Sequence, residues 1–247
     1  EYNTEQICRL IDETAEEEAK VVVFPELCIT GYTCGDLFTQ DLLLENAKKG
    51  LQKIATHTGN KDGIFFIGMP LAVDGELYNV AAAVNHGHIL GFTTKTFLPN
   101  YGEFYEMRQF CAGPKEARMI SFDGKMIPFG PQILFVAEEM QSLVISAEIC
   151  EDVWSPVPPS IQAAREGAVL IVNCSASDET IGKATYRKNL IEGQSARLLC
   201  GYIYANAGEG ESTTDVVFGG HNIIAENGTT LAMGQRFVNN VIYTEID

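Results

Sequence analysis

Residues 142–154, SLVISAEICEDVW, decide how this chain is organised. The β-branched, apolar run at 143–145 is typical of a buried strand, and the prolines after Trp154 lead into a helix start. In an α/β sheet, ligands bind just beyond the carboxyl ends of the strands. Cys150 stands at such a strand exit, so the pattern places a thiol where it can meet a substrate.

A structural alternative exists for this thiol. Most single cysteines behave as small buried hydrophobes, and that explanation serves for Cys150 when it is considered alone. Its acidic neighbours Glu148, Glu151 and Asp152 argue against it, because carboxylates are rarely buried unless they are paired. The position of Cys150 leaves both interpretations open, and its partners must decide between them.

The composition excludes several classes of partner. The 247 residues are 46% hydrophobic and 20% charged, which predicts a single globular domain over residues 1–247. The net charge of −16 disfavours nucleic acid and anionic membranes. No apolar run approaches the roughly 18–20 residues of a membrane span. We therefore expect neither nucleic acid nor a membrane as a partner.

The cysteines and histidines indicate free thiols rather than disulfides or metal. The seven cysteines are odd in number and none of their spacings is C-x-x-C, which favours a reducing compartment and hence a cytoplasmic location. The four histidines form no ligand-spaced cluster, so no metal site is predicted.

Hydrophobic periodicity predicts helices that alternate with strands and hairpins. Residues 97–131 are expected to be rich in loops. Helices are predicted at 3–14, 41–56, 160–166 and 183–199, and strands at 21–24, 63–69, 78–84, 88–93, 133–136, 143–145, 168–172, 202–205, 216–218, 222–225 and 238–246. This mixture predicts an α+β fold whose helices pack outside sheets that are not purely parallel.

Two further strand exits carry charged residues. Glu26 follows the apolar run at 21–24, and Lys95 follows the strand predicted at 88–93. Taken singly, Glu26 could cap a helix and Lys95 could be a surface charge. Together with Cys150 they supply what acyl transfer to a thiol requires: a base to form the thiolate and a cation to stabilise the oxyanion.

The three exits also resemble a known family. VVVFPE (21–26), KTFLPNYGEFYE (95–106) and AEICEDVW (147–154) are similar to the Glu, Lys and Cys motifs of the nitrilase superfamily of carbon–nitrogen hydrolases. LPNYGEFYEMRQF, ICEDVWSPVPPS and NCSASDETIGKATYR resemble the glutaminase domain of glutamine-dependent NAD synthetases. The resemblance implies an α-β-β-α sandwich of two mixed sheets. Its first strand could be missing, because family members begin with a strand before the first helix.

The resemblance also implies roles for individual residues. Glu26 would be the base, Lys95 the oxyanion-stabilising cation, Cys150 the nucleophile and Glu106 the residue that orients lysine and substrate. A second group would line the glutamine pocket, with Lys183 the weaker candidate because it could equally be a first-turn helix residue. These pocket residues are Tyr101, Glu151, Ser177 and Lys183.

The implied function is hydrolysis of the side-chain amide of glutamine through a thioester on Cys150. The ammonia would serve NAD synthesis from deamido-NAD in an ATP-dependent synthetase domain that this sequence does not contain. No cofactor is expected for the glutaminase half, whereas ATP and Mg²⁺ would serve only the synthetase domain, and a homo-oligomer is expected. Two alternatives stay open: a free-standing amidase acting on another small amide, and a binding module without turnover.

Overall fold

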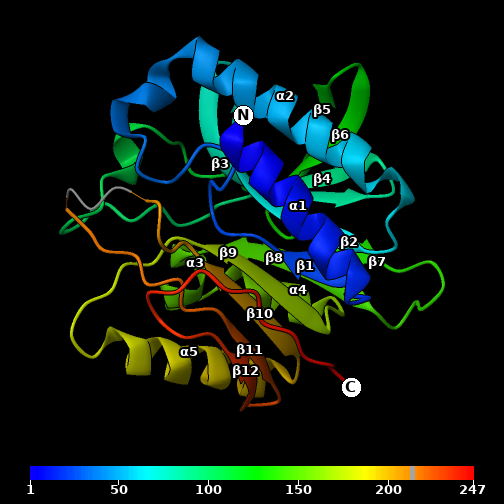
Figure 1. Cartoon of the computed structure of the whole chain (residues 1–247), viewed down its shortest axis with the longest axis vertical. Helices are drawn as coiled ribbons and strands as arrows, with labels where there is room; N and C mark the ends of the chain where they lie inside the picture. Colours follow the sequence, from blue (N-terminus) through cyan, green and yellow to red (C-terminus); the bar gives the residue numbers. More distant parts are fainter. Residues whose placement is uncertain (212–214) are drawn as a thin grey trace.

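Two six-stranded sheets pack face to face in the described residues, 1–211 and 215–247, of the computed structural model (Figure 1). The first sheet has the order β1 (Val21–Val23), β2 (Ile64–Val73), β3 (Glu76–Asn85), β4 (His88–Thr94), β6 (Lys125–Gly130) and β5 (Arg118–Phe122). The second has the order β12 (Thr229–Met233), β11 (Ile223–Glu226), β10 (Gly201–Asn206), β9 (Leu170–Ser175), β8 (Val144–Ile149) and β7 (Leu134–Val136).

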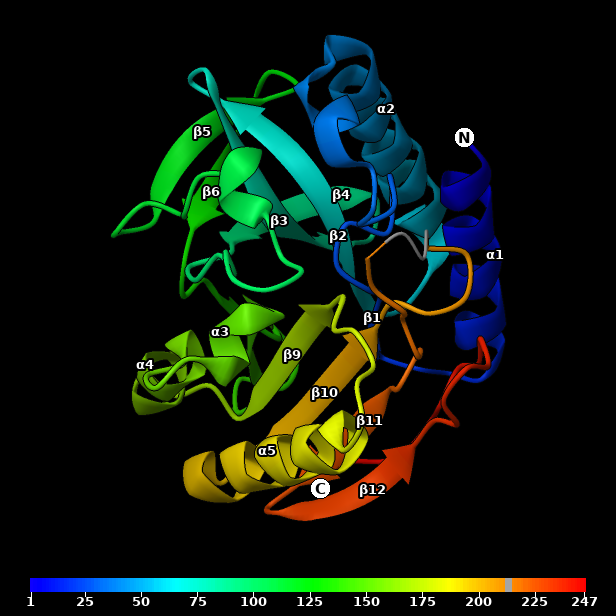
Figure 2. The same ribbon diagram turned by 90° about the vertical axis from the view of Figure 1, so that its left-hand side faces the viewer.

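Helices cover the outer faces of both sheets, as expected for a sandwich (Figure 2). The first sheet packs against α2 (Asp41–His57), which also contacts α1 (Tyr2–Glu16). The second packs against α3 (Glu151–Trp154), α4 (Pro159–Arg165) and α5 (Lys183–Leu198). Parallel and antiparallel pairs occur in each sheet. The predicted α-β-β-α sandwich of two mixed sheets is therefore confirmed.

The space between the sheets is an apolar core. Phe66 and Ala81 from the first sheet are fully buried, and they belong to the same cluster as Ile145, Val172 and Cys150 from the second. The edge of Phe66 meets Phe135 with ring centroids 5.6 Å apart. Cys150 therefore lies at the margin of the core that joins the sheets, so residues from both sheets can reach it.

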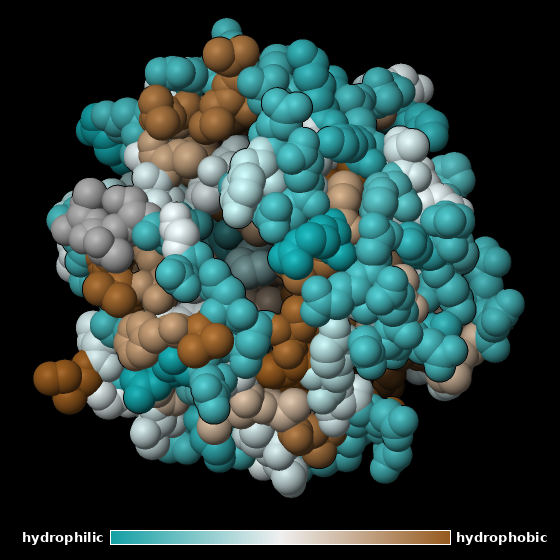
Figure 3. Space-filling model, in the orientation of Figure 1, coloured by the Kyte–Doolittle hydropathy of each residue, from teal (hydrophilic) through white to brown (hydrophobic). Residues whose placement is uncertain are grey.

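One face of the molecule is mainly hydrophilic. The space-filling view shows a largely hydrophilic face that is hollowed near its centre (Figure 3). Across the described residues, no helix combines the length and the apolar character that crossing a bilayer would require.

The prediction that residues 97–131 form mainly loops was wrong in its second half, where β5 and β6 make a hairpin. The buried positions Ile120, Phe122 and Ile127 alternate along these strands in the way that a half-buried strand requires. Asp123 and Gly124 both have positive φ, 51° and 73°, as a two-residue hairpin turn needs.

The strands predicted at 216–218 and 238–246 were also wrong. In the first, Phe218 forms only an isolated bridge with Asp178. In the second, the polar groups bond to loops: Asn239 accepts from the backbone of Glu209, and the Asn240 carbonyl accepts from Asn222. β11 pairs with β10 on one side and with β12 on the other, and β12 was not predicted.

Candidate active site

Three strand exits from two sheets bring the predicted catalytic residues to one end of the sandwich. Glu26 follows β1 and Lys95 follows β4, both in the first sheet, while Cys150 follows β8 in the second. The backbone N–H of Glu26 donates to the carbonyl of Ser175, at the end of β9, over 3.3 Å. This hydrogen bond crosses between the sheets and holds their ends together beside the thiol.

Lys95 is buried between two carboxylates. Its Nζ lies 2.7 Å from Glu26 Oε1 and 2.6 Å from Glu106 Oε1, and its side chain has no exposed surface. Burial alone would lower the pKa of Lys95, but the charges of Glu106 and Glu26 outweigh it and raise the pKa well above its ordinary value. The ammonium is therefore a permanent charge in a site that excludes water, and the alternative of a surface lysine is excluded.

Both carboxylates are oriented by further donors. Asn79 Nδ2 donates to Glu26 Oε1 over 2.6 Å, and the hydroxyl of Tyr32 donates to Glu106 Oε1 over 2.8 Å. The second oxygen, Oε2, of each carboxylate is buried and has no hydrogen-bond partner among the described residues. A carboxylate whose Oε1 is held by donors and whose Oε2 is open can accept a proton from a substrate or thiol.

Cys150 is held in a strained conformation. It has φ 43° and ψ −99°, a region that residues other than glycine rarely adopt and that occurs preferentially at functional sites. Its backbone N–H lies 3.1 Å from the carbonyl of Cys174 and 3.0 Å from Asn173 Oδ1. These contacts fix the backbone at the turn between β8 and α3, and therefore the position from which the Cys150 side chain projects.

The electrostatics of the thiol follow from its surroundings. Burial and then the negative charge of Glu26 raise the pKa of Cys150 above its ordinary value, while Lys95 opposes them. The resting group is therefore a neutral thiol. Because the thiolate is the nucleophile, reaction requires a proton transfer to a nearby base at the moment of attack.

Three of the four predicted pocket residues gather in front of Cys150. The hydroxyl of Tyr101 lies 3.0 Å from each carboxylate oxygen of Glu151, the residue after the thiol. Lys183 is the first residue of α5, pairs with Asp178 and stands over the rings of Trp154 and Phe104 at 5.4 and 5.6 Å. Lys183 is thus a residue of the first helical turn and also part of the group formed by Tyr101, Glu151 and Lys183, which we call the mouth of the site.

The fourth, Ser177, lies deeper. It is buried, its N–H donates to Asn206 Oδ1 over 2.7 Å, and its hydroxyl accepts from Arg187 Nη2 over 3.2 Å. Arg187 is itself fully buried and pairs with Glu179 at 2.5 Å. These contacts hold the turn after β9 and bury Ser177, whereas Tyr101 is exposed.

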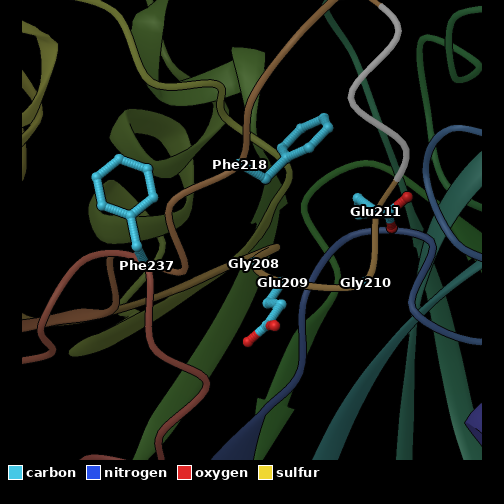
Figure 4. Close-up of a pocket in the computed structure, with 6 residues that line it drawn as sticks. All are labelled: Gly208, Glu209, Gly210, Glu211, Phe218 and Phe237. Atoms are coloured by element: carbon cyan, nitrogen blue, oxygen red, sulfur yellow. The ribbon is translucent and has the colours of Figure 1, made fainter.

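A pocket of about 380 Å³ adjoins the cluster, lined by Gly208, Glu209, Gly210, Glu211, Phe218 and Phe237 (Figure 4). Glu211 accepts from the backbone N–H of Tyr32 over 2.7 Å, and Phe218 meets the Tyr32 ring edge-on at 5.7 Å. Since Tyr32 also donates to Glu106, a single residue connects this pocket to the charged cluster.

Sequence reasoning did not identify Asn79 or Tyr32 as members of the cluster. Asn79 gives one usable signal, since it is a polar residue in an apolar strand and such a residue needs a buried partner. Tyr32 stands in an irregular segment after β1, where no periodicity applies, so only the fold brings it to Glu106. No group of three or more metal-ligating side chains occurs in the part of the chain that the structure describes.

The two carboxylates share one ammonium, which predicts a pH-dependent stability. Burial raises the pKa of Glu106 from 4.5 to about 7, although Lys95 opposes the rise. The folded protein therefore binds this proton more tightly than the unfolded chain, and stability is lost as the pH rises through that interval. We expect the unfolding free energy of the parent to fall relative to that of Glu106→Gln between about pH 5 and about pH 8. The fall should be about 1.4 kcal/mol for each unit by which the pKa of Glu106 in the folded state exceeds that in the unfolded state.

Urea unfolding of both proteins at the two pH values measures this difference. Glu116→Gln, a change at an exposed carboxylate, is the matched control and should track the parent. A constant difference between parent and Glu106→Gln across this range would contradict the shared-charge explanation.

Comparisons with known proteins agree with this geometry. The model of the family described as carbon–nitrogen hydrolase matches residues 1–247. A glutamine-dependent NAD(+) synthetase of Mycobacterium leprae is 42% identical over 235 residues, which are 95% of this chain and 35% of the relative. The chain thus spans about a third of the length of this relative.

Solved structures give the same picture. The crystal structure of a glutamine-dependent NAD(+) synthetase from Cytophaga hutchinsonii superposes with a TM-score of 0.85 at 32% identity, covering 95% of this chain and 38% of that one. An amidase of the nitrilase superfamily from Nesterenkonia superposes with a TM-score of 0.73 at 21% identity, covering 95% and 80% of the two chains. At that identity the second likeness concerns the fold alone.

Proposed function

This chain belongs to the carbon–nitrogen hydrolase family, and we propose on that premise that it hydrolyses the side-chain amide of glutamine. The observation that carries the proposal is the buried cluster in which Lys95 lies 2.7 Å from Glu26 and 2.6 Å from Glu106. These three charges act on the thiol of Cys150. A thiol with an adjacent base and an adjacent cation is suited to the cleavage of an amide, and the family to which the chain belongs hydrolyses carbon–nitrogen bonds.

The reaction would begin with the transfer of the Cys150 proton to Glu26 as the sulfur attacks the amide carbon. Negative charge that develops on the substrate oxygen is stabilised by the fixed ammonium of Lys95, and Glu106 holds that ammonium in place. Glu26 then gives its proton to the leaving nitrogen, the C–N bond breaks, and ammonia departs from a thioester.

Water completes the cycle. Glu26, again a carboxylate, takes a proton from a water molecule as the water oxygen attacks the thioester carbon. Glu26 then passes that proton to the Cys150 sulfur as the C–S bond breaks. The products are glutamate and ammonia, and the thiol is restored. The open Oε2 of Glu26 is the atom suited to carry the proton at each stage.

Glutamine as the amide is supported by the mouth in front of Cys150. An amino acid substrate has an ammonium and a carboxylate at its α-carbon, and the mouth offers the carboxylate of Glu151 and the ammonium of Lys183. Tyr101 contacts Glu151 through its hydroxyl. Opposite charges beside the thiol match a zwitterion better than a neutral amide.

The destination of the ammonia is proposed from the relatives. Because relatives such as the Mycobacterium leprae protein are named glutamine-dependent NAD(+) synthetases and are about three times as long, we propose that ammonia passes to a synthetase domain that uses ATP and Mg²⁺.

Assembly as a homo-oligomer stays a prediction. The seven free thiols support the expectation of a reducing, cytoplasmic location.

Selective labelling of Cys150 tests the proposal. We expect a diazo-ketone analogue of glutamine to label Cys150 alone among the seven cysteines, and glutamine to protect it, because this thiol lies beside the buried carboxylate of Glu26 and the buried ammonium of Lys95. Peptide mapping by mass spectrometry gives the distribution. Label spread over Cys28, Cys34 and Cys174 would contradict the nucleophile assignment.

Ammonia release from a set of amides completes the test. Release from glutamine, with little from simple aliphatic amides, is expected. Preference for another small amide would replace glutamine as the substrate, and the absence of release from every amide tested, with Cys150 unlabelled, would indicate a binding module.

A further inference from the structure

One buried carboxylate joins the segment that carries Lys95 to the segment that carries Cys150. Asp152 lies in α3, two residues after the thiol, and is fully buried. Its Oδ1 accepts from the backbone N–H of Thr96 over 3.0 Å and of Phe97 over 2.8 Å. Its Oδ2 accepts from the backbone N–H of Ile149 over 2.9 Å.

The positions of these three donors are the informative feature. Thr96 and Phe97 directly follow Lys95 at the exit of β4 in the first sheet, and Ile149 directly precedes Cys150 at the end of β8 in the second. Each oxygen of Asp152 therefore serves one of the two sheets. The hydrogen bond from Glu26 to Ser175 joins the neighbouring ends of β1 and β9, whereas Asp152 joins the exits of β4 and β8 themselves.

We propose that Asp152 is a positioning residue that sets the distance and orientation of Lys95 relative to Cys150. It contacts neither the substrate nor the thiol, and it acts only through the backbone on either side. Burial and the charge of Glu148 raise the pKa of Asp152 to about 8, and the backbone N–H groups of Ile149 and Phe97 oppose the rise. All three backbone donors favour the carboxylate, and hydrogen bonds from N–H groups to a carboxylate are short and strong. The inference rests on the proposed roles of Lys95 and Cys150.

Asp152→Asn isolates this task because it keeps the shape of the side chain. A carboxylate offers acceptors on both oxygens, whereas an amide offers one acceptor and one donor. An asparagine can therefore accept from Thr96 and Phe97 or from Ile149, but whichever way it turns, one segment loses its acceptor and faces a donor. A displacement of about 1 Å in a catalytic group can cost about a hundredfold in rate.

The first measurement is the alkylation of Cys150 by iodoacetamide, which needs no glutamine. We expect the rate constant at Cys150 to fall at least about tenfold in Asp152→Asn, while that of exposed Cys111 is unchanged within the same protein. Ser195→Ala is the matched control: it removes a buried hydroxyl that donates to the Cys200 carbonyl, at a site remote from both strand exits. It should leave both alkylation rates at the parental value.

The second measurement is the kinetics of glutamine hydrolysis. A positioning role predicts a fall of about a hundredfold in kcat with KM for glutamine within about twofold of the parent, because the pocket residues stay in place. Equal effects of Asp152→Asn and Ser195→Ala, or a change confined to KM, would overturn the proposal.

The outcomes separate this inference from the proposed function. If glutamine is not hydrolysed at all but the alkylation of Cys150 still depends on Asp152, the function fails and the positioning role stands. Parental alkylation in Asp152→Asn overturns the positioning role alone. If Asp152→Asn does not fold, Asp152→Ser replaces it, because a serine side chain is too short to bridge both segments. Loss of the fold in both variants would overturn a local role for Asp152.

Discussion

Lys95→Met is expected to abolish glutamine hydrolysis, with kcat lowered at least about a hundred- to a thousandfold, the usual consequence of losing one oxyanion donor. Methionine keeps the volume of the aliphatic stem but removes the ammonium that both Glu26 and Glu106 contact. No other cation lies in this cluster within the residues that the structure describes. Steady-state ammonia release measures the effect.

The same substitution tests the ion cluster through stability. It leaves two buried carboxylates without a counter-charge, and breaking a buried pair in this way typically costs about 3–5 kcal/mol, less whatever is recovered when a carboxylate binds a proton. Lys115→Met, at an exposed lysine, is the control and should stay within about 0.5 kcal/mol of the parent. Parental turnover by folded Lys95→Met would refute the oxyanion role.

Glu26→Gln is expected to lower turnover by about a hundred- to ten-thousandfold, the range that general base catalysis contributes. The amide is nearly isosteric with the carboxylate, and its oxygen can still accept from Asn79 and Lys95. It cannot take the proton of Cys150. Because Lys95 keeps Glu106 as a counter-charge, the thermal midpoint should change little.

Burst kinetics with a labelled glutamine analogue would show where the reaction stops. Glu26→Gln should form no thioester, since proton removal precedes attack. Glu45→Gln, on the exposed face of α2, is the control for the loss of one carboxylate. A lower midpoint with normal activity in the folded fraction would instead assign Glu26 a structural role.

The sequence by itself determined the class of fold and pointed to three candidate catalytic residues. β1 is a continuous apolar run and β8 begins with one, so both strands could be predicted, and the residues that follow them were expected at the edge of a sheet. Glu26, Lys95 and Cys150 were identified in this way. The end of β8 was not predicted: the strand was expected at 143–145, but it continues through Ser146 and Glu148 to Ile149.

Hairpin details could be predicted less well. The β5–β6 hairpin was missed because Pro128, within β6, reads as a break, although it forms a regular pair with Met119 near the edge of the sheet. The predicted strand at 238–246 has the residue types of a strand but no partner, since β12 already pairs with β11. Propensity describes a segment, whereas pairing depends on its neighbours.

Only the tertiary structure decided which side chains complete the site. Asn79 orients Glu26, Tyr32 orients Glu106, and Asp152 joins two strand exits from different sheets. These contacts join residues separated by as many as 74 positions in the chain. No local pattern encodes them, because they arise where two sheets, each built from its own periodicity, meet face to face and their strand ends come into register.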